Sequence, residues 1–163
     1  MASEIRKAVY TDVPAITGIY NEAILTTTAT FDTEPKTTAA QRKWFKAHGP
    51  KNPMLVAVEG IVVVGWASLS AYSDRCAYTD TAELSVYVKE KFRKRGIGRK
   101  LMQAVLDEGK KAGLHTVISR IAVGNDVSIH LHRQFDFADI GVMKEVGKKF
   151  GQLLDVSLMQ KMY

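Results

Sequence analysis

Residues 93–98 combine arginine, lysine and glycine in a pattern suited to binding phosphate groups. The order is Arg93-Lys94-Arg95-Gly96-Ile97-Gly98, between a β-branched strand pattern and a helical one. Glycines let backbone N–H groups converge on an anion without obstruction by a Cβ atom. A helix N-terminus adds free N–H donors, and the basic side chains add full charge. The segment therefore predicts a pyrophosphate site, whereas an ordinary solvated charge run needs no glycine at a strand-to-helix corner.

The positive charge of the chain is concentrated in the same segment. Lys and Arg number 23 and Asp and Glu number 17, a net charge of +6. Residues 89–100 hold seven basic side chains and one acidic one, which accounts for the whole surplus. A solvated face, a nucleic-acid surface and a site for a phosphorylated small molecule all fit this surplus. Only Tyr87 and Phe92 lie nearby as stacking partners, so a nucleic-acid-binding module is the less favoured alternative.

Other chemical motifs fail on spacing. Leu101 stands where a dinucleotide fingerprint needs its third glycine, and residues 141–149 have one residue too many for a P-loop. His130 and His132 are two apart on an expected helix and do not share a face, and no other cluster has metal-ligand spacing, so we predict no metal site. Cys76 is the only cysteine, which excludes an internal disulfide and favours a reducing cytoplasm.

The elements that must position these residues alternate between strands and helices. Hydrophobic periodicity, capping residues and turn residues predict them. Strands are expected at 5–9, 54–58, 61–70, 81–88, 116–123, 137–146 and 154–162, and helices at 11–26, 38–48, 96–112 and 125–135. The strand–helix–strand unit over 81–123 predicts a right-handed parallel crossover. We expect one domain, 1–163, with a mixed, mostly antiparallel α/β sheet and flanking helices, and neither a signal peptide nor a membrane-spanning run.

The combination of these segments resembles a known enzyme family. Arg93-x-x-Gly96-x-Gly98 after the strand Glu83 to Val88, with Asn125-x-x-Ser128 to His132 later, resembles the acyl-CoA signature of the GNAT acetyltransferase superfamily. Four blocks are similar to its phosphinothricin and methionine sulfoximine acetyltransferase branch, and the resemblance runs from about Ile5 to Gln160. These blocks are residues 19–23, 28–35, 85–88 and 146–151.

This resemblance implies a splayed parallel strand pair and a cofactor site between the strands. Acetyl-CoA would be the co-substrate, with its pantetheine arm added to the edge of the central strand and its pyrophosphate on the N–H groups of 94–99. The cofactor-binding residues implied are Val86, Tyr87, Val88, Lys94, Arg95, Gly96, Ile97, Gly98, Arg99, Asn125 and Ser128.

The resemblance also implies the catalytic groups. Glu83 matches the proposed general base, although a carboxylate satisfied by a neighbouring arginine, or an anchor for the substrate ammonium, fits as well. His132 stands where many members have tyrosine, so it could act as the general acid or be a structural histidine. Asp136-Phe137 replaces the usual Gly-Phe, which leaves the local turn open.

Acceptor recognition is expected in two loops. Arg75 would hold the carboxylate of an amino acid, since a planar guanidinium suits that group, or it could be a surface arginine. The other substrate-binding candidates are Phe31, Glu34, Tyr78 and Thr81.

Together these features predict an acetyl-CoA-dependent N-acetyltransferase. The acceptor would be the α-amino group of a small amino acid or analogue of the methionine sulfoximine, methionine sulfone or phosphinothricin type. Protein N-termini or polyamines are the alternative acceptors. We expect a cytoplasmic homodimer, with Lys148 and Phe150 reaching the partner's site, and neither nucleic-acid nor membrane partners.

Overall fold

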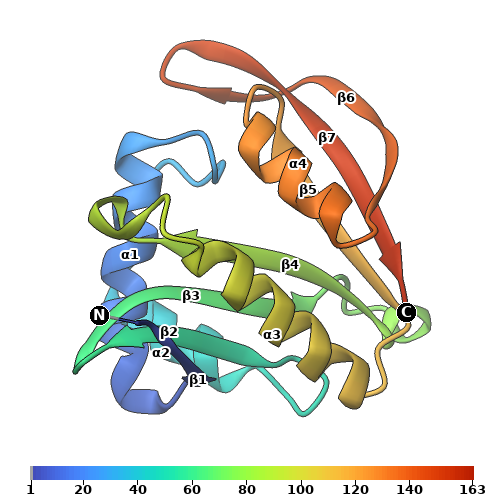
Figure 1. Cartoon of the computed structure of the whole chain (residues 1–163). Helices are drawn as coiled ribbons and strands as arrows, with labels where there is room; N and C mark the ends of the chain where they lie inside the picture. The colour runs from blue at the N-terminus through green and yellow to red at the C-terminus, as the bar shows by residue number, and fades with distance from the viewer. Residues whose placement is uncertain (1) are drawn as a thin grey trace.

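The computed structural model describes residues 2–163 and is built around one seven-stranded sheet (Figure 1). The strand order is β1-β2-β3-β4-β5-β7-β6, and only β4 and β5 run parallel. The expected mixed, mostly antiparallel sheet is therefore confirmed. The strands are β1 (Glu4–Lys7), β2 (Met54–Glu59), β3 (Val62–Ala71), β4 (Thr81–Val88), β5 (Thr116–Ala122), β6 (Ala138–Lys149) and β7 (Gln152–Met162).

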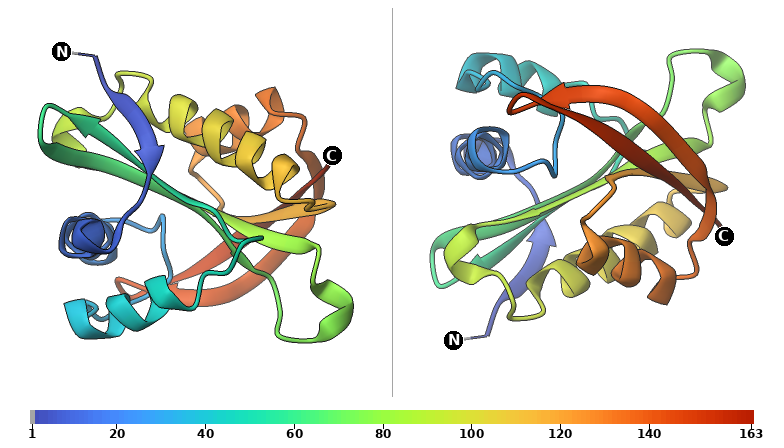
Figure 2. Two further views of the ribbon diagram at one scale, coloured as in Figure 1. Left: turned by 90° about the horizontal axis from the view of Figure 1, so that it is seen from below. Right: turned by 90° about the horizontal axis from the view of Figure 1, so that it is seen from above.

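Helices cover both faces of the sheet (Figure 2). One face carries α1 (Val13–Thr26) and α2 (Thr38–Lys46), and the other carries α3 (Ile97–Lys111) and α4 (Asp126–Gln134). Short 3₁₀ turns precede α1 at Tyr10–Asp12, β4 at Cys76–Tyr78 and α3 at Glu90–Phe92. No helix within residues 2–163 is long and apolar enough to cross a membrane.

Two hydrophobic clusters fix the helices on the sheet. Leu101, Met102 and Val105 of α3 are fully buried against the inner strands, as the helical spacing predicted. On the opposite face, Ile16 and Ile19 of α1 pack with the strands in the second cluster. Burying both faces of the central strands holds their backbone rigidly, which gives a stable frame for a site.

The connection from β4 through α3 to β5 matters most for the site. Gly96, with φ +77°, is the N-cap of α3, and Gly113, with φ +86°, follows its end. Both backbone conformations favour glycine, so these residues place the two ends of the helix. After this crossover, β5 meets β4 in the parallel pair that the strand–helix–strand pattern predicted.

The observed boundaries differ from the predicted ones at a few places. The N-cap of α2 is Thr37, whose hydroxyl accepts from the Ala40 N–H at 3.1 Å, and not Thr38 as its capping-box spacing indicated. The terminal hairpin is also longer than predicted. β6 continues to Lys149 because a bulge between Met143 and Gly147 restores its pairing with β7.

Candidate active site

The two parallel strands, β4 and β5, diverge along their length (Figure 1), and we call the space between them the slot. Their pairing covers Thr81 to Glu83 on β4 and ends at the Glu83–Ile118 pair. Beyond this point lies a cavity of about 240 Å³. It is lined by Ala29, Leu84, Ser85, Val86, Tyr87, Val88, Arg93, Gly98, Met102, Ser119, Arg120, Ile121, Ala122, Asn125, Val127, Ser128, Leu131 and His132. The divergence exposes one edge of a central strand to this cavity.

The edge of β4 in this cavity is available to an extended ligand. From Leu84 to Val88 the strand pairs with β3 on one side but has no β5 partner on the other. Arg93 Nε donates to the Val88 carbonyl at 3.0 Å, which closes the end of this edge. An unpaired strand edge can bind an extended, amide-containing chain through main-chain hydrogen bonds.

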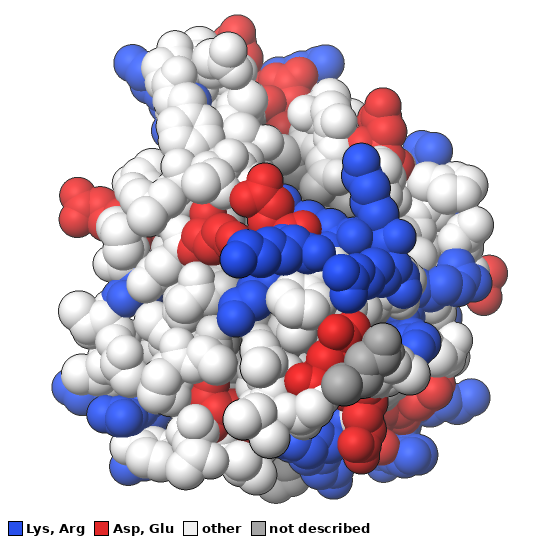
Figure 3. Space-filling model, turned by 60° about the vertical axis from the view of Figure 1, so that its left-hand side comes forward, with Lys and Arg blue, Asp and Glu red and all other residues white. Residues whose placement is uncertain are grey.

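At the end of the slot, the backbone forms an anion-binding loop. The N–H groups of residues 94–99 have no hydrogen-bond acceptor among the described residues, because the first N–H of the α3 ladder is that of Lys100. Lys94, with φ +63°, and Gly96 turn the chain so that it enters the helix. Figure 3 brings forward the side of the molecule on which this loop lies and shows basic side chains gathered there. Free N–H groups, a helix N-terminus and exposed cations together suit a pyrophosphate.

The basic side chains around the loop are partly engaged with neighbours. Arg95 lies 3.7 Å from the Glu59 carboxylate and over the Phe92 ring. Arg99 donates to Gln134 and lies over the Phe135 ring. Surface contacts of this kind contribute little to stability, so the side chains can turn toward a bound anion at small cost.

His132 is buried in the wall of the cavity with both ring nitrogens in hydrogen bonds. Nδ1 lies 2.7 Å from the Ser128 carbonyl, and Nε2 lies 3.0 Å from the Ser119 hydroxyl. Because a carbonyl only accepts, Nδ1 carries the proton and Nε2 accepts from Ser119. Burial lowers the pKa of His132, so the neutral ring is favoured. Asn125, the N-cap of α4, accepts from the Ser128 N–H at 3.4 Å and thereby fixes the start of this helix.

Glu83 forms an ion pair with Arg120 of β5 across the opening between the two strands. Arg120 Nε and Nη2 donate to the same oxygen, Glu83 Oε2, at 2.8 and 2.5 Å. The sequence left open whether Glu83 is a base or a carboxylate paired with an arginine. The pairing is present, and it leaves Oε1 free of any hydrogen bond from the described residues.

Aromatic side chains pack on the α1 side of β4, next to the cavity. Tyr87 contacts the rings of Tyr20 and Trp66, with ring centroids 5.2 and 5.1 Å away, and its hydroxyl donates to the Ala29 carbonyl at 3.4 Å. Burial raises the pKa of Tyr87 to about 12, so the phenol stays neutral at physiological pH. These contacts attach the loop after α1 to the central strand.

The predicted substrate residues are more dispersed than the cofactor residues. Phe31 lies half-buried in the loop after α1, so close to Gly147 that an added Cβ at Gly147 would lie 2.2 Å from its ring. Glu34 is exposed in the same loop. Arg75 and Tyr78 are exposed in the segment before β4, and neither they nor Thr81 line the cavity.

Sequence reasoning missed two polar residues that line the cavity, Ser119 and Arg120 of β5. Alternation along the strand is the signal that was available. Val117, Ser119 and Ile121 are buried toward α3 and α4, while Arg120 lies on the opposite face. The alternation predicts on which face of β5 Arg120 lies, but only the tertiary structure shows that it pairs with Glu83.

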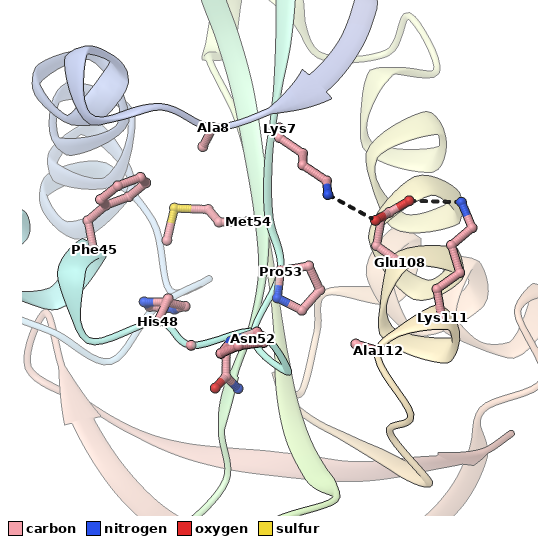
Figure 4. Close-up of a pocket in the computed structure, with 12 residues that line it drawn as sticks. Lys7, Ala8, Phe45, His48, Asn52, Pro53, Met54, Glu108, Lys111 and Ala112 are labelled. Carbon is pink, nitrogen blue, oxygen red and sulfur yellow. Dashed lines mark hydrogen bonds and ion pairs between the residues drawn. The ribbon is translucent and has the colours of Figure 1, made fainter.

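A second hollow lies elsewhere, near the ends of α2 and α3 (Figure 4). It is larger, about 440 Å³, and Phe45, His48, Pro53 and Met54 lie on one side of it. Glu108 lies on the other side between Lys7 and Lys111, at 3.7 and 2.9 Å. The two cations of this hollow, Lys7 and Lys111, are thus already paired with Glu108. The hollow contains neither the unpaired strand edge nor the anion-binding loop. Size alone therefore does not identify the site.

Comparison with known proteins places this geometry in a family. The family model for the acetyltransferase (GNAT) family matches residues 16–137. The chain is 38% identical over 162 residues to an L-methionine sulfoximine/L-methionine sulfone acetyltransferase of Pseudomonas paraeruginosa, covering 98% of this chain and 94% of that protein. The chain belongs to the GNAT acetyltransferase family. The predicted family and the predicted class of enzyme, an acyltransferase, are thereby confirmed.

Two further relatives of this GNAT acetyltransferase bear on its ligands. The L-amino acid N-acyltransferase MnaT of Escherichia coli is 36% identical over 157 residues, covering 96% of this chain and 91% of that one. The crystal structure of a GNAT superfamily phosphinothricin acetyltransferase from Sinorhizobium meliloti in complex with acetyl-CoA has a TM-score of 0.95. It is 34% identical, with 99% of this chain and 89% of that chain covered. The predicted acetyl-CoA co-substrate is confirmed for the family, and the loop and strand edge described above fit it.

Proposed function

We propose that this chain transfers the acetyl group of acetyl-CoA to the α-amino group of a small amino acid or analogue. Methionine sulfoximine, methionine sulfone and phosphinothricin represent the acceptor class, since relatives named for these compounds align with the chain over nearly its full length. One observation carries the proposal. The free edge of β4 lines a cavity that reaches Gly98 of the loop with unpaired N–H groups, residues 94–99, and a carboxylate, Glu83, lies where β4 and β5 separate.

The residues of the slot would divide the work of binding and orientation. The N–H groups of 94–99 and the basic side chains around them would hold the phosphates, and the β4 edge from Leu84 to Val88 would align the pantetheine arm. Asn125 and Ser128 would lie beside that arm from the start of α4. Acetyl-CoA supplies the activated acetyl thioester, and the protein supplies position and proton handling.

Glu83 would assist removal of the proton from the acceptor amine, directly or through a water molecule. Its Oε1 is free to accept, and its side chain is 29% exposed beside the cavity. A Glu83→Gln variant keeps the shape and removes the basicity, so kcat/KM is expected to fall about 100-fold or more. Proton donation by His132 stays a prediction. In this geometry Nε2 accepts from the Ser119 hydroxyl, so it would have to be protonated before it could donate.

The direct test is an acceptor screen. Purified protein and acetyl-CoA are incubated with each amino acid analogue, and CoA release is followed with a thiol reagent while the product is identified by mass spectrometry. We expect N-acetylated amino acids with wild-type protein and strongly reduced yield with Glu83→Gln. CoA release with polyamines or N-terminal peptides, but with no free amino acid, would favour the alternative acceptors. If none of these compounds gives CoA release above the blank, the proposal is refuted.

We further propose a homodimer that works in a reducing cytoplasm. The edge strand β6 exposes Ile140 and Val142, and Phe150 is exposed at the hairpin turn, where it lies beside Lys149. Cys76 is free and exposed, as expected of a chain that needs no disulfide. Sedimentation velocity should give twice the chain mass, with a shift to the monomer in Val142→Lys. A monomer at micromolar concentration would contradict this part of the proposal.

The basic segment 89–100 would serve the phosphates of the co-substrate and not a nucleic acid. Any retardation of DNA or RNA in a gel is then expected to disappear with moderate salt or added CoA. Retardation that persists under both conditions would contradict this assignment.

A further inference from the structure

The Glu83–Arg120 pair has an unusual arrangement of free atoms. Both hydrogen bonds from the guanidinium go to one oxygen, Oε2. Arginine carries five N–H donors, so both protons of Nη1 and one of Nη2 are left without a partner among the described residues. On the carboxylate, Oε1 is equally unused. The pair therefore presents a free cationic edge and a free anionic oxygen side by side.

The position of the pair makes these free atoms accessible to a ligand. Glu83 is the last β4 residue that pairs with β5, and its partner there is Ile118. Arg120 lies two residues beyond Ile118, where the strands have separated. The Arg120 side chain reaches back across this opening, is 51% exposed and lines the cavity. Among residues 2–163, Arg93 is the only other lysine or arginine that lines the cavity, and its Nε donates to the Val88 carbonyl.

We propose that Arg120 binds the carboxylate of the acceptor amino acid while Glu83 receives its ammonium group, so that the pair recognises the zwitterion. This inference rests on the amino-acid N-acetyltransferase function proposed above and assigns its specificity to a residue of β5. The two charged groups of an α-amino acid are attached to one carbon, which matches two charged side chains in direct contact. The Nη1–Nη2 edge of a guanidinium holds a carboxylate through two parallel hydrogen bonds.

The competing candidate for this role is Arg75. It was predicted from the resemblance, but it is exposed, its guanidinium has no hydrogen-bond or ion-pair partner among residues 2–163, and it does not line the cavity. A purely structural role for Arg120, joining the separating strands, is the second competitor. The three possibilities predict different dependence on the carboxylate of the acceptor, so one series of variants separates them.

The experiment compares L-methionine sulfone with 3-(methylsulfonyl)propylamine, which keeps the amine and lacks the carboxylate. Wild-type protein, Arg120→Ala, Arg120→Lys and Arg75→Ala are assayed for kcat and KM. Binding of the two compounds without acetyl-CoA is also measured by calorimetry. Arg133→Ala is the matched control, because Arg133 also pairs with a carboxylate, that of Asp139, but lies on the exposed surface of α4 away from the cavity.

Arg120→Ala is expected to raise KM and Kd for the amino acid about 10- to 100-fold, as loss of a charge-assisted contact does, and to change those for the amine less than threefold. Arg120→Lys should restore part of the loss, and Arg133→Ala should leave both compounds unaffected. Equal losses for both compounds in Arg120→Ala, or selective loss of amino-acid binding in Arg75→Ala alone, would overturn the inference. An absence of transfer to any amino acid by wild-type protein would instead refute the proposed function.

Discussion

Replacing Gly147 with alanine tests how the β6–β7 hairpin is seated on the loop after α1. A Cβ at this position would lie 2.2 Å from Phe31 Cε2 and 2.4 Å from Cδ2. Because carbon atoms pack at roughly 3.5–4.0 Å, the ring or the hairpin must move by at least about 1.3 Å. The loop cannot simply withdraw, since the Lys149 ammonium donates to the Thr30 carbonyl at 2.7 Å. Such overpacking costs about 1–3 kcal/mol.

The opposing effect is conformational, since alanine in a strand is more stable than glycine by about 0.5–1 kcal/mol. Gly141 on the same strand is the matched control, because nothing lies within 4 Å of a Cβ built there. Urea denaturation should therefore show Gly147→Ala destabilised relative to Gly141→Ala by about 1–3 kcal/mol.

A double-mutant cycle identifies the contact responsible. Phe31→Ala removes the clashing ring. Gly147→Ala should therefore lower the free energy of unfolding less in the Phe31→Ala protein than in the wild type. Additive free energies of unfolding, or equal stability of the two alanine variants, would show that the hairpin does not press on Phe31 in solution.

Three further predictions concern other strained or buried groups. Asp136 has φ +65° where glycine is favoured, so Asp136→Gly should stabilise the protein by about 0.5–1 kcal/mol, and an unchanged or lower melting temperature would contradict the assigned turn. Lys149→Met leaves the Thr30 carbonyl without its donor and should lower the free energy of unfolding by about 1–3 kcal/mol; an unchanged urea midpoint would argue against that bond. Burial lowers the pKa of His48 and His132, so the unfolded chain binds more protons below about pH 6.5, and stability should decline as pH falls through that region. His132→Gln should flatten the decline, and an identical slope would contradict the buried neutral ring.

Much of the fold could be predicted from the sequence, because the local sequence pattern of its helices and strands agrees with their packing in the tertiary structure. The apolar spacing of Leu101, Met102 and Val105 reports burial on one face, and glycine at Gly96 reports a backbone conformation that few other residues adopt. The anion-binding loop was predictable for the same reason. Its chemistry depends on backbone N–H groups at a helix start and not on distant contacts.

The acceptor side of the site was less predictable because it depends on contacts between distant segments. Glu83 and Arg120 are 37 residues apart and meet only where β4 and β5 separate. The sequence placed the carboxylate recognition in the exposed loop at Arg75, which carries a suitable guanidinium but lies outside the cavity lining. Asp136 shows the reverse case, since its departure from the family pattern marked a turn whose positive φ the structure contains.

Hydrogen–deuterium exchange with and without acetyl-CoA tests the central claim, that the slot beside β4 holds the co-substrate. The N–H groups of residues 94–99 have no acceptor, and the β4 edge from Leu84 to Val88 has no β5 partner, among the described residues. Acetyl-CoA is expected to slow exchange in peptides spanning 84–88 and 94–99 and to leave exchange unchanged in peptides that line the hollow near His48 and Glu108. Protection at that hollow, with none at 94–99, would contradict it.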